Sequence, residues 1–81
     1  LAKARFFERH QGQFNERQLK ALARVFREGI DGFKGGLSAE NYIAITQASR
    51  ATATRDLQDL VSKGALLRTG ERRHTRYALS I

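Results

Sequence analysis

One short helix in this sequence has a face whose residue types and spacing could bind nucleic acid. Residues 50–63 are predicted to be helical, because Ser49 can cap the first turn and Gly64 tolerates the left-handed φ that often follows a helix. Apolar residues that include Leu57 and Leu60 repeat at helical spacing and would bury one side of this basic helix. The other side presents small, polar and basic residues of the kind that contact base edges in a DNA major groove: Arg50, Ala51, Thr54, Arg55 and Gln58. A surface helix with a solvated polar face has a similar composition, so the flanking elements must decide between the two interpretations.

The overall charge favours an anionic partner. The 81 residues include 15 Lys and Arg against 8 Asp and Glu, which gives a net charge of +7. Residues 49–81 hold +4 of this charge, and residues 1–48 hold +3 over a longer stretch. The basic density is therefore higher in the C-terminal part, as expected if that part contacts phosphate backbones or another anionic surface.

The composition argues against several other classes of protein. A chain of this length suits one domain with a modest core. It has no cysteine, which excludes a disulfide framework and a thiolate metal site. No apolar run approaches the ~20 residues of a membrane span, so we expect no membrane association. The chain begins with Leu and has no signal-peptide pattern, so we expect a cytoplasmic piece of a longer protein.

Two further helices are predicted before the basic helix. Asn15 can cap a helix over 15–28, and Gln18 can reach back to the cap as in a capping box. A short helix over 39–46 follows, and residues 47–49 form a tight turn into the basic helix. A short helix joined in this way to a second helix with a polar outer face is typical of a helix-turn-helix.

A hairpin is predicted after the basic helix. Residues 65–70 and 75–81 alternate like strands on either side of a basic tip at 71–74. The order of elements predicts a mainly α fold with a small β hairpin, a winged helix-turn-helix with a three-helix core and a wing, over residues 14–81. Residues 1–13 are predicted to be a linker helix from a missing upstream domain, with phenylalanines that pack either on this domain or on a preceding one. The residues expected to be buried together are Leu22, Phe26, Ile43, Leu57, Leu60, Leu66 and Tyr77.

The run of residues 42–66 resembles the C-terminal winged-helix domain of bacterial Fic-family (filamentation induced by cAMP) proteins. The segments FFER at 6–9, NERQL at 15–19 and RHTRY at 73–77 fit the same family. A weaker similarity links the chain to DeoR-type regulators. The resemblance implies DNA binding and transcription regulation, with double-stranded DNA, an upstream Fic catalytic domain and a second copy of the chain as expected partners.

The chain departs from that family in two respects. The family's wing tip tends to be rich in glycine, whereas Glu71 and Arg72 follow Gly70 here. The Fic catalytic motif, His-Pro-Phe followed by a Gly-Asn-Gly-Arg loop, does not occur, and the chain contains no proline. The resemblance therefore implies that a parent protein transfers AMP and that this fragment does not.

No other pattern predicts an enzyme, a metal site or a cofactor. The glycine-rich stretch 29–36 lacks the Gly-Lys-Ser/Thr that a phosphate-binding loop requires, and is better explained as a loop. His10 is expected on the surface. Asp56 is expected to be a structural partner of a wing arginine, Arg73 or Arg76, and not a catalytic acid.

Two functions remain open from the sequence. In the first, the chain is a DNA-binding module whose wing residues hold the phosphate backbone while the basic helix reads base edges. Arg55 is then the better candidate for a base contact, because Arg50 begins its helix and could instead clamp a phosphate. In the second, the same fold is a protein-interaction or dimerisation module that positions the enzyme. The wing residues expected at the DNA are Arg72, Arg73, His74 and Arg76; for His74, a solvated loop position is the alternative.

Overall fold

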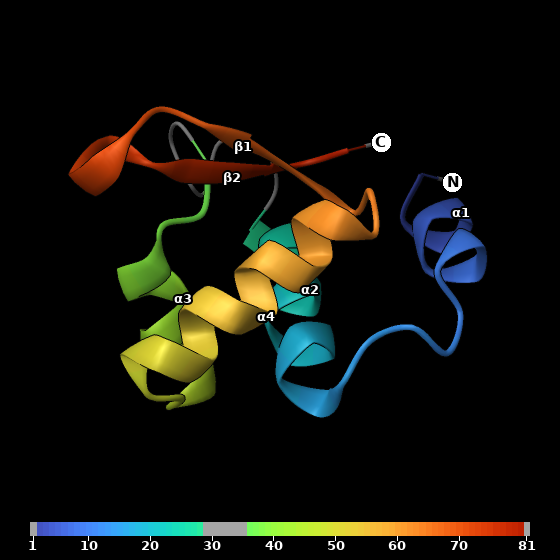
Figure 1. Ribbon diagram of the computed structural model, residues 1–81. Helices are drawn as coiled ribbons and strands as arrows, with labels where there is room; N and C mark the ends of the chain where they lie inside the picture. Colours follow the sequence, from blue (N-terminus) through green and yellow to red (C-terminus); the bar gives the residue numbers. More distant parts are fainter. Residues whose placement is uncertain (1, 29–35, 81) are drawn as a thin grey trace.

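Helices pack together beneath a small antiparallel hairpin in the computed structural model, which describes residues 2–28 and 36–80 (Figure 1). The hairpin lies across one end of the helical layer, and α4 lies in front of α2 in this view. This arrangement is that of a winged helix-turn-helix, as the sequence predicted. The elements are α1 (Ala2–Arg9), α2 (Glu16–Glu28), α3 (Ala39–Thr46), α4 (Arg50–Ser62), β1 (Leu66–Thr69), the short 3-10 helix η2 (Arg72–His74) and β2 (Arg76–Leu79).

The starts of α2 and α3 are fixed by reciprocal side-chain bonds. At α2, the Gln18 backbone N–H donates to Asn15 Oδ1 at 2.8 Å, and the Asn15 backbone N–H donates to Gln18 Oε1 at 2.9 Å. This is the predicted capping box, and it satisfies backbone donors that the first turn leaves free. At α3, Ser38 and Asn41 exchange the same pair of bonds. Capping explains why both helices begin within a residue of their predicted starts.

Both ends of α4 follow the predicted chemistry. Gln47 ends α3 in the left-handed region with φ 63, so the chain turns sharply into α4. Ser49 then accepts a hydrogen bond from the Thr52 N–H, which caps α4. At the other end Gly64 has φ 78, and the Ala65 N–H donates to the Leu60 carbonyl at 2.9 Å. That bond closes the helix in the pattern common before a left-handed glycine.

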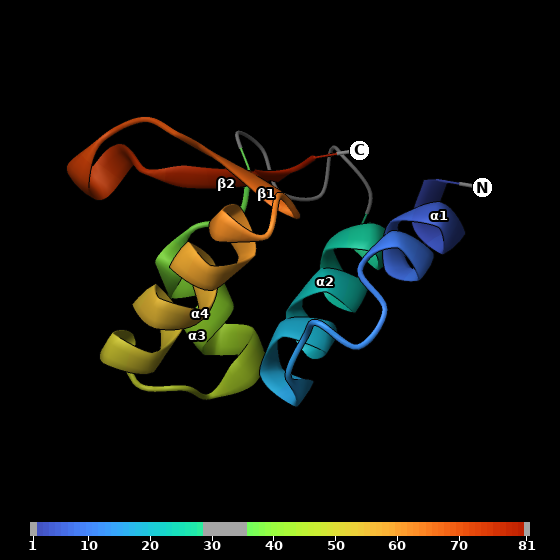
Figure 2. The same cartoon turned by 45° about the vertical axis from the view of Figure 1, so that its right-hand side comes forward.

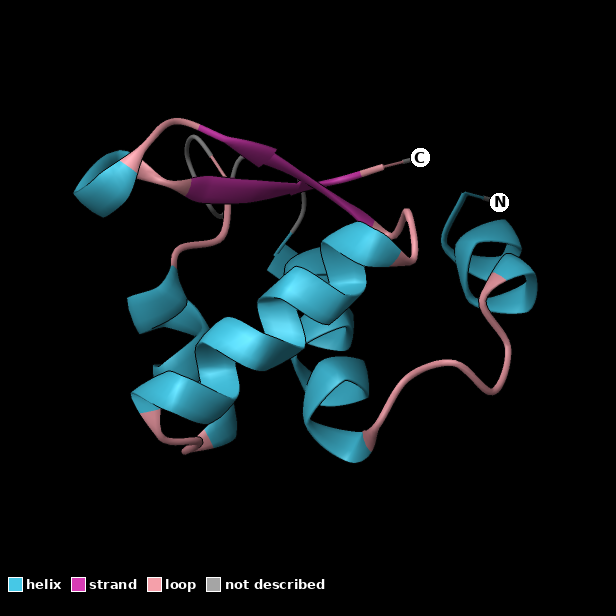
Figure 3. Cartoon of the chain, in the orientation of Figure 1, coloured by secondary structure: helices cyan, strands magenta, loops and turns pink. Residues whose placement is uncertain are grey.

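The strands β1 and β2 form a hairpin over the helices (Figure 3), and its register decides which side chains face them. Leu66 pairs with Leu79 and Arg68 pairs with Tyr77, so these four share one face of the hairpin. Leu67, which lies on the other face, is 56% exposed. Arg68 therefore points to the same side of the hairpin as the buried Tyr77.

A short bridge joins the hairpin to the segment before α3. The Leu37 N–H donates to the Tyr77 carbonyl and the Tyr77 N–H donates to the Leu37 carbonyl, both at 2.8 Å. The sequence analysis missed this bridge, because one extended residue gives no alternation to read. The bridge fixes the wing relative to the start of α3. Of the glycine-rich stretch 29–36 predicted to be a loop, residues 29–35 lie outside the described residues.

The predicted core is present. Leu22, Leu57, Leu60, Leu66 and Tyr77 are buried together. The other two predicted members, Phe26 and Ile43, are half-buried and pack against this cluster.

The N-terminal helix α1 lies beside α2, on the side away from α3 and α4 (Figure 2). Phe6 is 1% exposed, and its ring centroid lies 5.3 Å from that of Phe26 and 6.0 Å from that of Phe14. Of the two arrangements left open, packing of this phenylalanine on the domain is therefore the one found. The prediction of a surface position for His10 was wrong. It follows Phe6 by one helical turn, is 6% exposed, and its ring lies 5.4 Å from that of Phe14.

Candidate nucleic-acid interface

The outer face of α4 carries the five residues that the sequence predicted to contact DNA. Arg50, Ala51, Thr54, Arg55 and Gln58 are all exposed. They are exposed because the opposite side of the helix is taken up by buried side chains, which places these five on the solvent side by helical periodicity. The geometry therefore leaves the basic, polar face of α4 open to a partner.

A groove runs between α4 and the hairpin. Its volume is about 570 Å³. It brings three of the predicted helix residues together with one predicted wing residue, and adds Arg68, which the sequence analysis did not select. The register of the hairpin could have identified Arg68, since it lies two residues from the inward-facing Leu66. The groove is lined by Arg50, Thr54, Gln58 and Val61 of α4, by Arg68, Arg72, Thr75 and Tyr77 of the hairpin, and by Ala39 and Glu40 of α3.

Ala51 and Arg55 lie outside the groove lining, on the part of α4 that faces directly away from the core. The candidate site thus has two parts. One is the open ridge that carries Arg55, and the other is the groove beside it with Arg50, Arg68 and Arg72 around its rim.

The tip of the wing has an unusual backbone. Arg72 has φ 53, a left-handed value that is uncommon for a residue with a side chain. Gly70 has φ 75, and a Cβ added there would lie 2.3 Å from the His74 carbonyl oxygen. Only glycine fits that close approach, so the tip is a tight structure even though it has fewer glycines than the resembling family.

The other predicted wing residues are not brought together around the groove by the structure. His74 is exposed and does not line the groove. Arg76 is half-buried, and its Nη1 donates to the Thr75 carbonyl at 2.8 Å. The side chain of Arg73 lies outside what the structure describes, although its backbone forms part of η2.

One acidic residue faces the cations of the groove. Glu40 Oε1 lies 3.4 Å from Arg50 Nη2, with both side chains largely exposed. The pKa of Glu40 is lowered, first by a hydrogen bond from its own backbone N–H and then by Arg50 and Arg76. Glu40 is thus ionised at neutral pH and shares Arg50 with any anion that enters the groove.

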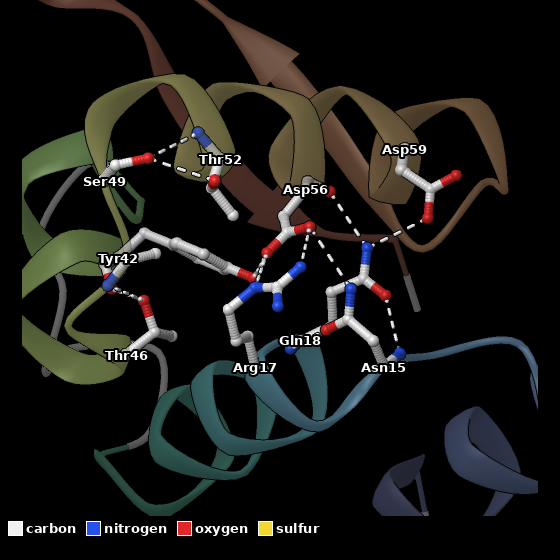
Figure 4. A network of polar contacts seen from close by, with 10 residues as sticks. Asn15, Arg17, Gln18, Tyr42, Thr46, Ser49, Thr52, Asp56 and Asp59 are labelled. Carbon is white, nitrogen blue, oxygen red and sulfur yellow. Dashed lines mark hydrogen bonds and ion pairs between the residues drawn. The ribbon is translucent and has the colours of Figure 1, made fainter.

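Asp56 holds α4 against the other two helices of the core (Figure 4). Its Oδ2 accepts from the Tyr42 hydroxyl at 2.7 Å and from Arg17 Nε at 2.7 Å. Its Oδ1 accepts from Arg17 Nη2 at 3.1 Å and from Asn15 Nδ2 at 3.2 Å. The structural role predicted for Asp56 is present, and the arginine found with it is Arg17 of α2. Of the two predicted partners, Arg76 donates to the Thr75 carbonyl, and the side chain of Arg73 lies outside what the structure describes.

The electrostatics of this cluster follow from its burial and its bonds. Burial raises the pKa of Asp56, but the hydrogen bonds from Arg17, Tyr42 and Asn15 outweigh it and leave the pKa below the usual value. Burial and the bond to Asp56 raise the pKa of Tyr42 well above its usual value. Asp56 is therefore a fixed anion inside the domain, and it sets the position of α4.

A second contact lies one turn further along α4. Gln18 Nε2 donates to the Asp56 carbonyl at 3.1 Å and to Asp59 Oδ2 at 2.9 Å (Figure 4). Asp59 also pairs with Lys63 at 2.7 Å. Asp59 is half-buried and follows Arg55 by one helical turn, so it lies at the edge of the exposed ridge, where its bond to Gln18 ties α4 to α2.

The described residues hold no group of three or more His, Cys, Asp or Glu side chains arranged to bind a metal ion. The longest helices, α2 and α4, have 13 residues each, and no helix in the part of the chain that the structure describes could cross a membrane. No protein-family model and no curated protein matches the chain.

Proposed function

We propose that this chain is a DNA-binding winged-helix module that inserts the ridge of α4 into the major groove and rests the wing on the neighbouring backbone. The observation that carries the proposal is the groove between α4 and the hairpin, with Arg50, Arg68 and Arg72 around it and Arg55 on the adjoining ridge. Helical ridges of this kind fit the width of a DNA major groove.

Each side chain of the site suits a particular contact. Arg55 projects away from the core, where a guanidinium can bond guanine O6 and N7. Gln58 can pair with adenine, and Ala51 can pack on a thymine methyl group. The arginines around the groove are suited to phosphates, which fix position and orientation but carry no sequence information directly.

The surface supports this proposal over the protein-interaction module. A broad exposed apolar patch around Phe6, Phe7 or Val25 would favour that alternative. Phe6 is buried, and Phe7 and Val25 are half-buried against the core. Among the described residues, the exposed large hydrophobic side chains are Leu19 and Leu67, on different elements.

The resemblance to Fic-family C-terminal domains extends the proposal. In this view the module follows a catalytic domain in a longer cytoplasmic protein and couples that enzyme to DNA. The fragment itself has no proposed catalytic role.

The test begins with selection of bound sequences from random duplex DNA, followed by salt titrations on the selected site and a scrambled one. Arg55→Ala should cost about 1–3 kcal/mol on the selected site and relax preference at one base pair. Arg72→Ala should weaken both duplexes about equally and lower the salt slope by about one unit.

Arg5→Ala is the matched control, because Arg5 is an exposed arginine on α1, away from the site. It should have a smaller effect than either substitution above. Absence of binding by the wild-type chain at low salt would refute the proposal and favour the interaction module.

A further inference from the structure

A second basic surface lies on α2. A groove of about 690 Å³ runs between α2 and α3 and is bordered by Lys3 of α1. Three cations of α2 line it, Lys20, Arg24 and Arg27. None of the proposed DNA-contacting residues belongs to this groove, so it is separate from the site on α4.

The two basic surfaces face opposite ways. On α2, Gln18, Ala21 and Leu22 are buried, and Gln18 bonds α4. Helical periodicity places Lys20 and Arg24 on the opposite side of α2, where both are exposed. The pair of helices α2 and α4 therefore lies between the two surfaces, as the position of α2 behind α4 in Figure 1 illustrates.

The cations around this groove are poorly compensated. Arg24 pairs with Glu28 at 2.8 Å, but Lys3, Lys20 and Arg27 have no carboxylate partner among the described residues. Lys20 and Arg24 stand at i, i+4, and Arg24 and Arg27 at i, i+3, which are repulsive spacings on a helix. An anion bound across them would relieve that repulsion.

The lining of the groove distinguishes between kinds of anionic partner. Protein interfaces concentrate aromatic residues, Met and Arg and are depleted in Lys. This groove has no aromatic lining residue, and its apolar members are only Ala23, Ala44 and Ile45. A protein segment would find no deep anchor there. The three α2 cations span about 10 Å along the helix axis, which is close to the rise over three steps, or four successive phosphates, on one strand of a duplex.

We infer that this α2 face is a second contact surface for the phosphate backbone of duplex DNA, so that one copy of the domain can hold two duplex segments at once. The inference rests on the proposed function, because the first duplex is the one bound at α4. The domain measures 32 × 24 × 20 Å, so two duplexes held on opposite sides lie within the range of energy transfer between fluorescent labels.

The experiment mixes the 81-residue chain at low salt with two short duplexes, one labelled with a donor and one with an acceptor. Energy transfer should rise as protein is added and fall again when protein exceeds DNA, because each duplex then has its own protein molecule. Transfer should also disappear steeply with added salt.

Two triple variants with the same loss of charge separate the surfaces. Lys20→Gln/Arg24→Gln/Arg27→Gln should abolish transfer and keep the affinity for a single duplex within roughly threefold of wild type, since only long-range attraction is lost. Its melting temperature should be unchanged or higher, because Gln forms helices about as well as Lys and Arg and the like-charge repulsion is removed. The matched control, Arg50→Gln/Arg68→Gln/Arg72→Gln, should weaken single-duplex binding by roughly tenfold or more.

The possible failures are distinct. No binding of a single duplex by wild type would refute the proposed function itself. Single-duplex binding without transfer would overturn only the second surface, as would transfer that survives the α2 substitutions. Binding of phosphatidylserine vesicles that depends on the α2 cations, without a second duplex, would assign this face to a membrane and overturn the inference.

Discussion

Replacing Asp56 with alanine should remove the interaction that joins α2, α3 and α4. The carboxylate is buried, and its two oxygens accept from Tyr42, Arg17 and Asn15. Solvent cannot replace it as an acceptor for the Tyr42 hydroxyl, because Tyr42 is itself fully buried.

The magnitude follows from what is left unpaired. A buried hydroxyl without a partner costs about 1–3 kcal/mol. Loss of the bonds from Asn15 and Arg17 adds a smaller destabilisation, because Arg17 is 43% exposed and water can replace the carboxylate there. Asp56→Ala should therefore destabilise the domain by about 2–4 kcal/mol, which for a domain of this size lowers the melting temperature by roughly 10–20 °C.

A double-mutant cycle tests the assignment by urea unfolding. Tyr42→Phe should cost about 1 kcal/mol by itself, and the double variant should cost about 1–2 kcal/mol less than the sum, since phenylalanine leaves no hydroxyl unpaired. Asp59→Ala is the control on the same helix and should cost about 1 kcal/mol or less, because Asp59 is 44% exposed. Additive costs for Asp56→Ala and Tyr42→Phe would refute the reasoning.

Three further predictions concern pH, the core and the groove. Because the folded pKa of Asp56 lies below its usual 3.8, its stabilising contribution is complete above about pH 4 and is lost as the pH falls below that value, and melting curves of wild type and Asp56→Ala should converge there. Leu57→Ala should cost about 2–5 kcal/mol in urea unfolding, because Leu57 is fully buried in the core, and a melting temperature unchanged within a degree or two would contradict this. Glu40→Gln should raise affinity for duplex DNA by roughly threefold at low salt and steepen the salt dependence, since it removes the anion that shares Arg50, and equal affinities for variant and wild type would show that the pair does not compete with phosphate.

The helices and their ends could be predicted because their causes are local. A cap needs only a side chain two or three residues away, as at Asn15 and Ser49. A helical stripe such as that of Leu57 and Leu60 is visible in the spacing alone. These signals also located the exposed face of α4, since the buried stripe and the open face are determined together.

The partner of Asp56 could not be predicted, because it depends on how α2 approaches α4. Arg17 is distant in sequence, and several arginines would have satisfied the same charge. The position of His10 also depends on tertiary packing, since its ring is buried only because α1 folds back onto Phe14. Arg68 was missed for a different reason, because its direction depends on the hairpin register and not on composition.

The bridge between Leu37 and Tyr77 has a consequence for how the domain is made. The strand β2 that carries Tyr77 is synthesised after the helices, and yet it covers their core and pairs with a residue that precedes α3. Contacts between distant segments form late, and a domain folds as a unit once all its parts are available. On the ribosome, Leu66 and the apolar stripes of the helices would therefore stay uncovered by β2 until that strand has left the exit tunnel. That interval is when a nascent chain of this protein would most need a chaperone.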